Sequence, residues 1–553
     1  MRLGRQIMKK IIRLLWVFGL VMALTGCSGN EDQPNTEVGE TTNDTDVTAT
    51  DADETTDAEN IKTVEPTFGG TLRIASYAPK TLDPISNDQQ SVLQVLGLIY
   101  EPLFVLDETL MPVPVLVASH SFENEGSTLT IKLKDNVLFH NGVKLTSSDV
   151  AYTINRIKDL GYSSYKNQVR PIKNTTVVDE LTLKIYYNQG YAFALSDLTF
   201  PIISRQYVTS SGYDDMFPIG TGPYRFVNYQ QMQNFDLTAN LDWHSEGLYI
   251  ENIKGVIMND SQAMETLFDQ KLIDIMNPSK FNWLKYSDNE EQRITSYTSS
   301  YYDFIGFNFD RPLFLDKETR QAFAYAVNRE FILYDRFINH GKLVNAPIIP
   351  GSWYATEREP HYNYDLEVAK RLVDTKYIDF DGDGFFDYAD EAKQTSIELT
   401  MLVNKENSLR VHTAEIIKKD FEALGFKILL DIVEPNIYYE KINMGDFDLL
   451  YGGWKMSQVP DYGSLFASYG LQNHIRYKSE TMDQLINGIV GAYTMDQLKV
   501  SVNNFEAHMI EEVPYISLYF LDGAVMSGKN VYGTIHPNTE WMFHGIENLY
   551  LDF

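Results

Sequence analysis

Aspartate and glycine residues recur at fixed spacing in one short segment, DFDGDGFFDYAD, which covers residues 379–390. Numbered as a twelve-residue EF-hand loop, the segment offers oxygen ligands at positions 1, 3, 5, 7, 9 and 12, and Gly384 stands at position 6. Calcium needs several hard oxygens around a tight glycine turn, so this spacing predicts a structural Ca²⁺ site. The predicted ligands are Asp379, Asp381, Asp383, the Phe385 carbonyl, Asp387 and Asp390.

The last position of this loop departs from the usual pattern. Asp390 stands where glutamate is usual, and its shorter side chain makes bidentate ligation harder. Outside the cell an affinity of about 10⁻⁴ to 10⁻³ M would suffice. The alternative interpretation is a surface turn rich in aspartate and glycine that holds no ion.

Catalytic motifs are sparse in the chain. The ten histidines form no HExxH motif, and no GxSxG segment occurs. Residues 163–166 match SxxK and residues 287–289 match SDN, a pair found in penicillin-recognising enzymes, but the third motif, KTG or KSG, is missing. We therefore interpret both matches as chance, and a surface hydrolase remains the more distant alternative to a protein without catalytic activity.

Cys27 is the only cysteine in the 553 residues, which excludes a disulfide framework and a thiolate-ligated metal site. It follows a cationic start and an apolar run from Leu14 to Leu24, the order of a signal peptide. The run is shorter than the roughly 20 apolar residues of a membrane-spanning helix. Residues 24–27, LTGC, resemble a bacterial lipobox, in which the cysteine sulfur receives a diacylglyceryl group. We expect a signal peptide over 1–27 that ends in a lipidated Cys27, rather than a buried core cysteine.

The segment 28–66 has an acidic, threonine-rich composition with almost no large apolar side chain. Such a segment cannot bury enough surface to offset its ordering entropy, so we predict a disordered tether that holds the rest of the chain away from a membrane. The whole chain carries a formal charge of −30, and the part after the tether stays strongly acidic. This charge argues against binding to nucleic acid or lying flat on anionic lipid.

The remaining chain is too long for one core and mixes strand-like with helical patterns, which predicts an α/β protein of two or three domains. A variant capping box begins a helix at Thr146, with Asp149 three residues later. Strands are predicted over 69–77, 127–139 and 182–187, a buried strand over 426–434, and helices over 320–333 and 411–425.

Nine short motifs, in this order, resemble the bacterial extracellular solute-binding proteins of family 5, the oligopeptide- and dipeptide-binding lipoproteins of ABC importers. They are GGTLRIA (69–75), TLDP (81–84), IYEPLF (99–104), LFHNGVKLTSSDVAYTINRI (138–157), PIGTGPYRF (218–226), RQAFAYAVNRE (320–330), AKRLV (369–373), GDFDLLYGGW (445–454) and NHIRY (473–477). The resemblance implies a two-lobe fold of the periplasmic-binding-protein type, the large three-domain variant with mixed sheets and a hinge. It also implies that the lobes close over a ligand.

The resemblance further implies domain boundaries in the body of the chain. The first lobe would comprise residues 67–108, 218–302 and 530–553, with an extra domain inserted over 109–217. The second lobe would comprise residues 303–529.

In peptide-binding relatives an aspartate three residues after the tryptophan of the GW motif holds the ligand's amino terminus. Here that tryptophan is Trp454, and the third residue after it is Ser457, which carries no charge. Asp461 is the nearest acid after it, while Asp88 and Tyr77 fall in regions that line the cleft of relatives. These five residues are the predicted ligand-binding residues, and Trp454 could instead be ordinary core.

We therefore expect a lipid-anchored receptor on the extracytoplasmic face of a bacterial membrane, with no catalytic residues and no cofactor needed for activity. It would act as a monomer, bind an oligopeptide or dipeptide and deliver it to an ABC permease. The neutral Ser457 leaves a non-peptide solute as the alternative ligand.

Overall fold

The computed structural model describes residues 65–258, 260–278, 285–286, 291–388 and 395–552. The predicted signal peptide with Cys27, nearly all of the predicted tether, the SDN match and Asp390 lie outside these ranges. Within the described part of the chain, no helix is both long and apolar enough to span a membrane.

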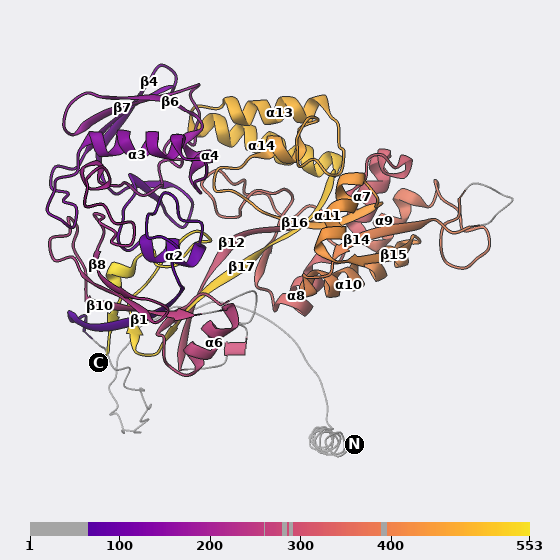
Figure 1. The fold of residues 1–553 in the computed structure, drawn as a ribbon. Coiled ribbons are helices and arrows are strands. Elements are labelled where there is room, and N and C mark those ends of the chain that lie inside the picture. Colours follow the sequence, from indigo (N-terminus) through magenta and orange to yellow (C-terminus); the bar gives the residue numbers. More distant parts are fainter. Residues whose placement is uncertain (1–64, 259, 279–284, 287–290, 389–394, 553) are drawn as a thin grey trace, which may run out of the picture. The chain divides into compact units, whose positions relative to one another are not determined.

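The first sheet contains β1 (Gly69–Tyr77), which has the predicted bounds and buries alternate residues. β1 runs parallel to β10 (Ile250–Met258). The antiparallel strands β9 (Asn234–Ala239) and β8 (Tyr224–Gln230) complete the order β1-β10-β9-β8 (Figure 1).

A second, fully antiparallel sheet lies within residues 117–187 and has the order β4-β5-β7-β6. Its strands are β4 (Val117–Glu123), β5 (Thr128–Leu133), β6 (Ile172–Val177) and β7 (Thr182–Tyr187), the last with the predicted bounds. The strand predicted over 127–139 stops at Leu133, because the chain after it turns and Phe139 N–H donates to Val143 O at 2.8 Å.

The predicted capping box is confirmed at the start of α3 (Ser147–Asp159). The Thr146 N–H and hydroxyl both donate to Asp149 Oδ2, at 2.9 and 2.7 Å. The helix turns Val150 and Ile154 into the core beside β6 and β7, as its apolar spacing requires.

The segments FHNG (139–142) and GTGPY (220–224) contact each other through hydrogen bonds to the backbone. His140 N–H donates to Gly220 O at 2.8 Å, and His140 Nε2 lies 3.0 Å from Gly222 O. Gly222 N–H in turn donates to Ile99 O at 2.8 Å. A Cβ atom on Gly220 would lie 2.0 Å from Ile99 O, so only glycine allows these backbones to meet.

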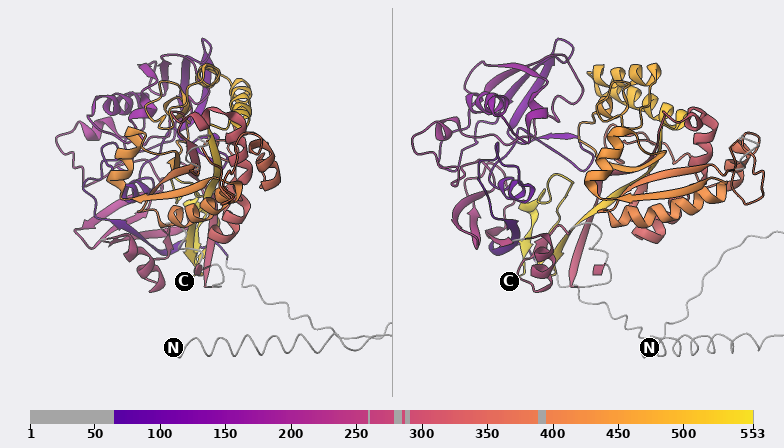
Figure 2. Two further views of the ribbon diagram at one scale, coloured as in Figure 1. Left: turned by 90° about the vertical axis from the view of Figure 1, so that its right-hand side faces the viewer. Right: turned by 45° about the vertical axis from the view of Figure 1, so that its right-hand side comes forward.

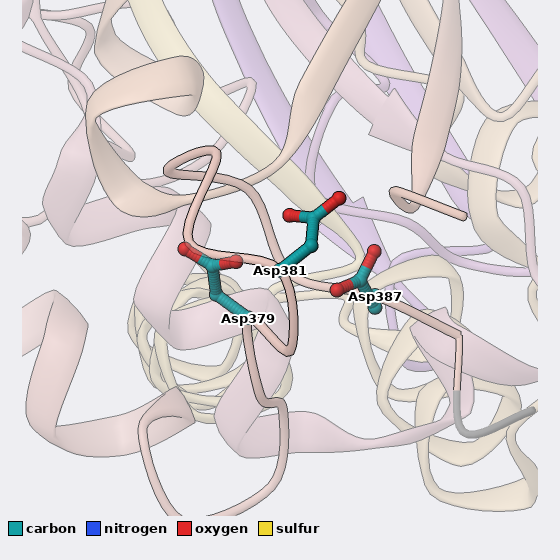
Figure 3. Close-up of side chains that lie close together, drawn as sticks. All are labelled: Asp379, Asp381 and Asp387. Atoms are coloured by element: carbon teal, nitrogen blue, oxygen red, sulfur yellow. The ribbon is translucent and has the colours of Figure 1, made fainter. Parts of the chain in front are cut away.

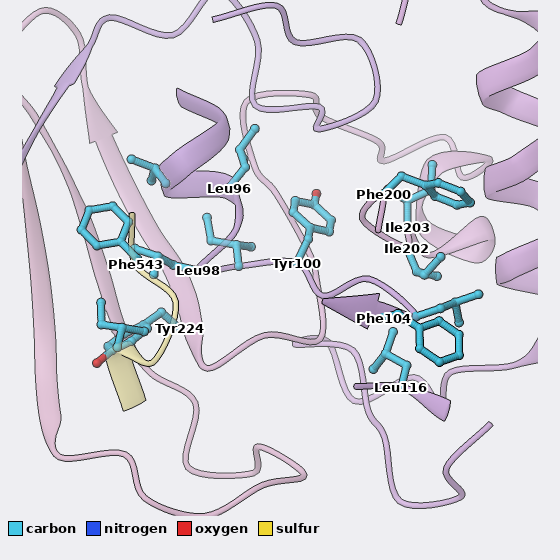
Figure 4. Packing of buried hydrophobic residues seen from close by; sticks show 14 of the residues in the cluster. Leu96, Leu98, Tyr100, Phe104, Leu116, Phe200, Ile202, Ile203, Tyr224 and Phe543 are labelled. Carbon is cyan, nitrogen blue, oxygen red and sulfur yellow. The ribbon is translucent and has the colours of Figure 1, made fainter. Parts of the chain in front are cut away.

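A large apolar cluster surrounds this contact and includes residues from both sheets and from the C-terminal segment. Figure 4 shows part of it: Leu96, Leu98, Tyr100, Phe104, Leu116, Phe200, Ile202, Ile203, Tyr224 and Phe543. The last residues of the chain therefore pack with the first strands.

The third sheet has seven strands, in the order β11-β17-β12-β16-β14-β15, with β13 paired to β17. They are β11 (Ile275–Met276), β12 (Gln292–Phe307), β13 (Gly341–Leu343), β14 (Glu398–Asn404), β15 (Lys427–Val433), β16 (Leu449–Lys455) and β17 (Tyr515–Gly528). β12 and β17 are the long strands, and both views of Figure 2 show them running side by side.

The segment 398–455 forms the predicted alternation of strand and helix. α10 (Ser408–Leu424) connects β14 to β15 and ends at Gly425, whose φ of 111° is left-handed. α11 (Pro435–Met444) leads to β16, and β14 is parallel to both neighbours. The prediction of a buried strand over 426–434 is wrong in one respect: β15 is an edge strand, so Leu429 remains 50% exposed.

The helix predicted over 320–333 is two helices. α7 (Lys317–Ala326) ends where Val327 takes an extended conformation, and α8 (Arg329–Phe337) begins with Asn328 as its cap. The Asn328 side chain accepts a hydrogen bond from Phe331 N–H at 3.0 Å. Apolar periodicity continues across this break, so the pattern alone did not reveal it.

The other elements are short strands and helices that connect or cover these sheets. They are α2 (Gln90–Leu96), β2 (Phe104–Leu106), β3 (Pro112–Pro114), α4 (Lys166–Val169), α5 (Arg205–Val208), α6 (Ser261–Asp269), η2 (Pro312–Leu315), α9 (Leu366–Val373), α12 (Tyr462–Phe466), α13 (Glu480–Gly491), α14 (Met495–Glu512), β18 (Val531–Tyr532), η3 (Ile546–Asn548) and β19 (Tyr550–Leu551).

We predict that His140 makes folding stability depend on pH. Burial lowers the pKa of its imidazole to about 4 from 6.5, and the contact with Gly222 O opposes this only in part. As the pH falls, the unfolded chain therefore binds the proton first. The folded state should lose up to about 3 kcal/mol of stability between pH 6.5 and pH 4.

Urea unfolding of the wild type and of His140→Gln between pH 7 and pH 4.5 measures this effect. The variant should show a shallower dependence on pH, whereas His412→Gln, which removes an exposed imidazole, serves as the control. Parallel pH profiles for wild type and His140→Gln would contradict the prediction.

Candidate functional site

Trp454 lies near the end of β16, in an aromatic stack on one face of the third sheet. Its ring is nearly parallel to that of Phe304 in β12, with centroids 6.0 Å apart, and to that of His474, 5.7 Å away. Phe304 stacks in turn on Tyr515 at 4.1 Å and on Tyr302 at 5.7 Å. Trp454 is half-buried, so this stack continues from the core toward the surface.

The opposite face of the same strands carries a buried ion pair. Asp303 in β12 accepts two hydrogen bonds from Arg410 of α10, at 3.0 Å from Nε and 2.6 Å from Nη2. The exposed fractions of the two side chains are 6% and 19%. Such a forked contact fixes both position and orientation.

Two glycines of the GGW motif leave space for the aromatic stack on one face and for the ion pair on the other. A Cβ atom on Gly452 would lie 2.8 Å from the Phe304 ring, and one on Gly453 would lie 1.9 Å from Arg410 Nη2. The motif therefore places the aromatic stack and the ion pair on opposite faces of one strand pair. The pairing of β12 with β17 shifts in register between Thr298 and Tyr302 and again between Asp303 and Phe304, in the same part of the sheet.

Protonation around the ion pair follows from burial and charge. Burial alone would lower the pKa of Arg410, but the neighbouring Asp303 carboxylate raises it above its ordinary value. Burial raises the pKa of both Tyr451 and Tyr519, whose hydroxyls lie 2.9 Å apart. At neutral pH this layer holds a charged guanidinium and neutral phenols.

In the outer part of the aromatic stack, two polar atoms lack a regular hydrogen bond to a described residue. Burial raises the pKa of Tyr515, and the nearby Trp454 indole lowers it by a smaller amount. Neither Trp454 Nε1 nor the Tyr515 hydroxyl makes a hydrogen bond of normal geometry with a described residue. Burial, and then the charge of Arg476, lowers the pKa of His474, which favours a neutral imidazole against Trp454.

The other residues predicted from the GW motif lie just after β16. Ser457 is exposed. Asp461 is the N-cap of α12, where its Oδ1 accepts a hydrogen bond from Ser464 N–H at 3.1 Å. The carboxylate that stands nearest in sequence to the family's anchoring position is therefore engaged in capping a helix.

Asp88 and Tyr77 lie at the first sheet and do not contact Trp454 in the described structure. Asp88 is about half exposed and forms an ion pair with Lys80 at 3.6 Å. Tyr77 ends β1, where its N–H donates to Ser91 Oγ at 3.2 Å. A cavity of about 10 Å³ beside Tyr77 has room for one water at most.

A larger hollow, of about 570 Å³, opens beside β8 and is lined by residues such as Met216, Phe217 and Met232. None of the predicted ligand-binding residues lines it. It is an open depression on the surface, so we do not propose it as the ligand site.

The residues of the SxxK match do not form a nucleophile–base pair. Ser163 Oγ accepts a hydrogen bond from Tyr165 N–H at 3.3 Å, and Lys166 Nζ donates to Lys158 O at 2.7 Å. Both groups serve the local fold around α4.

The predicted metal loop lies between α9 and β14. It brings together carboxylate oxygens of Asp379, Asp381 and Asp387, all within 4.8 Å of one another. Asp383 is exposed in the same loop, whereas Asp390 is outside the described residues.

Sequence reasoning missed Asp303 and Arg410. A usable signal was present, because Asp303 is the one charged residue in the otherwise uncharged run SYYDFIGFNF, residues 300–309. A lone carboxylate in such a strand needs a buried partner, but the sequence does not say which cation supplies it.

Comparison with known proteins identifies the family. The model of bacterial extracellular solute-binding proteins, family 5, matches residues 111–474. The chain belongs to this family. Family 5 proteins bind solutes outside the cytoplasm, and both the family and the α/β fold class predicted from the motifs are confirmed.

Relatives cover almost the entire described body of this family 5 protein. The oligopeptide-binding protein AppA of Bacillus subtilis is 25% identical over 516 residues, which span 88% of this chain and 92% of AppA. Its structure in complex with a nonapeptide is 23% identical, covers 88% of this chain and 100% of that one, and has a TM-score of 0.63.

Two other solved structures share the fold. The ABC transporter substrate binding protein CtaP of Listeria monocytogenes is 21% identical, with 88% and 100% coverage and a TM-score of 0.74. NikA of Brucella suis, in complex with Fe(III)-EDTA, is 17% identical, with 87% and 100% coverage and a TM-score of 0.72.

We predict that replacing only one member of the Asp303–Arg410 pair lowers the free energy of unfolding more than replacing both. Asp303→Leu would leave the Arg410 guanidinium buried without its counter-charge, and Arg410→Met would do the same to the Asp303 carboxylate, so each single variant should cost about 3–5 kcal/mol of unfolding free energy. The double variant Asp303→Leu with Arg410→Met should be less destabilised than either single variant, since it removes both charges. Urea unfolding of the four proteins measures the coupling, and strictly additive effects would contradict the prediction.

Proposed function

We propose that this family 5 protein is the lipid-anchored, extracytoplasmic substrate-binding component of an ABC importer and that it binds an oligopeptide or dipeptide. AppA, which covers nearly the same length of chain, is named for oligopeptide binding and was solved with a nonapeptide. Delivery to a permease is part of the proposal and is supported by the similarity to CtaP, which is named an ABC transporter substrate binding protein. We expect no catalysis at the site.

The observation that carries the peptide proposal is the open side of β16 at Trp454. β14 pairs with β16 only from Leu449 to Tyr451, whereas β12 pairs with it as far as Lys455. In the described structure, Gly452 to Lys455 therefore have no strand on the β14 side. An extended peptide can add to such an edge through its backbone, and its side chains can rest on the aromatic stack.

The second candidate is a solute other than a peptide. Ser457 offers no charge to an ammonium group, and the Asp461 carboxylate already caps α12. NikA, with a similar fold, was solved with Fe(III)-EDTA. The same edge and stack could hold a compact solute that has no free amino terminus.

Native mass spectrometry of the purified full-length chain tests the ligand class. We expect a series of co-purified masses that fragment as peptides, and we expect Trp454→Ala to lose them because the outer ring of the stack is gone. Trp243→Ala, which removes another half-buried indole bonded to Glu101, is the matched control and should retain them. A sugar or a metal chelate in place of peptides would favour the second candidate.

Lipid anchoring is tested at Cys27. Cys27→Ser should move the protein from the membrane fraction to the soluble fraction, because the sulfur that would carry the diacylglyceryl group is gone. Ser28→Ala is the control and should remain on the membrane. Intact mass measurement of the wild type should show the added acyl chains, and an unmodified Cys27 would refute the anchor.

A further inference from the structure

The loop between α9 and β14 is held at its base by the fold. The backbone of Asp387 forms bridges to Ile378 on one side and to Ser396 on the other. The neighbouring Phe386 ring packs on Phe426, with centroids 5.2 Å apart, and its N–H donates to Gly425 O at 2.7 Å. The position of Asp387 is therefore set by backbone pairing at the base of the loop and by the contacts of its neighbour Phe386 with Gly425 and Phe426 at the end of α10.

The tip of the loop folds back over this base. Asp379 accepts hydrogen bonds from Gly382 N–H at 2.7 Å and from Gly384 N–H at 2.9 Å. Both glycines have left-handed φ values, 78° and 95°, which other residues rarely adopt. This turn places the carboxylates of Asp379 and Asp381 on the side of the loop where Asp387 lies, as Figure 3 shows.

Asp387 gives the independent sign that the loop holds a ligand. The residue as a whole is only 4% exposed. Oδ2 accepts a hydrogen bond from Phe380 N–H at 2.8 Å, but Oδ1 is buried and has no hydrogen-bond partner in the described structure. A buried carboxylate oxygen without a partner costs free energy, and a folded protein rarely leaves such an atom uncompensated.

No described basic side chain compensates this charge. The nearest preceding lysine, Lys376, forms ion pairs with Asp316 and Glu318, both at 2.6 Å. A carboxylate oxygen of Asp387 instead lies within 4.8 Å of carboxylate oxygens of Asp379 and Asp381. Three carboxylates so close together repel one another, and a cation among them would offset that repulsion.

We propose that this loop binds one Ca²⁺ ion, which the carboxylate oxygens of Asp379, Asp381 and Asp387 ligate. Calcium takes six to eight oxygens in flexible geometry, which suits ligands from one short loop, and water can complete the shell. Magnesium demands a stricter octahedron and keeps more of its water. The ion would be structural, and the proposal does not depend on the identity of the transported solute.

The expected affinity is that of an extracellular module, a Kd of about 10⁻⁴ to 10⁻³ M. An ion that binds only the folded state raises the unfolding temperature as its concentration rises above Kd. Millimolar Ca²⁺ should therefore shift the melting curve upward, and a chelator should reverse the shift.

The test uses the full-length chain freed of metal with EDTA and then dialysed. Isothermal titration with CaCl₂ should give one site per chain, and differential scanning calorimetry with and without 10 mM CaCl₂ (about ten or more times the expected Kd) should show the shift. Asp381→Asn, at an exposed position, should weaken binding at least ~10-fold, since even outer-shell partners of metals contribute that much. Asp387→Asn should abolish binding.

Asp374→Asn is the matched control, because it removes an exposed carboxylate from the same segment outside the loop. It should leave the calcium affinity unchanged. If Asp387→Asn fails to fold, Asp381→Asn still decides the outcome. Absence of calcium heat in the wild type, equal affinity for Mg²⁺, or unaltered binding by Asp381→Asn would overturn the proposal.

Discussion

The antiparallel pairing of β12 with β17 connects the rest of the structure. The two strands pair from Gln292 with Gly528 to Gly306 with Tyr515. At one end they pack with Met276 and the residues around α6, and at the other they enter the core formed by α7, α8 and α10. β16 pairs with β12 along its length, so this pairing also positions the GGW motif.

The same pairing explains why the candidate site has two chemically different faces. Side chains alternate along β12 and β16, so the aromatic rings gather on one face and the Asp303–Arg410 pair on the other. The ion pair ties α10 to β12 beneath the stack, and Gly453 is the residue that leaves space for it. Rigidity on one face supports an aromatic surface on the other, as the proposed binding site would require.

Ser457 is neutral and Asp461 caps α12, and both facts bear on how the amino terminus of a ligand could be held. A receptor that holds a free amino terminus by a buried carboxylate would lose most of that contact with serine. In the proposed peptide complex the binding energy would come instead from the backbone edge of β16 and from the ring surface around Trp454. Both contacts tolerate variation in the ligand, since neither depends on a particular side chain of the ligand.

Several local features could be predicted from sequence because their causes are local. The bounds of β1 and β7, the capping box at Thr146 and the helix end at Gly425 each depend on residues within a few positions. The break between α7 and α8 was missed because apolar periodicity is the same on both sides of Asn328. The exposure of β15 was missed because a strand's place in a sheet is not written in its own residues.

What the sequence by itself determined was the family, through an ordered set of motifs, and the spacing of aspartates in the loop after α9. Only the tertiary structure decided that Arg410 pairs with Asp303, 107 residues away in the chain. Only it showed that Asp387 is buried with one oxygen unpaired and that β16 has an open side at Trp454. Motif spacing is a property of neighbouring residues, whereas burial and long-range pairing depend on which distant segments the fold brings together.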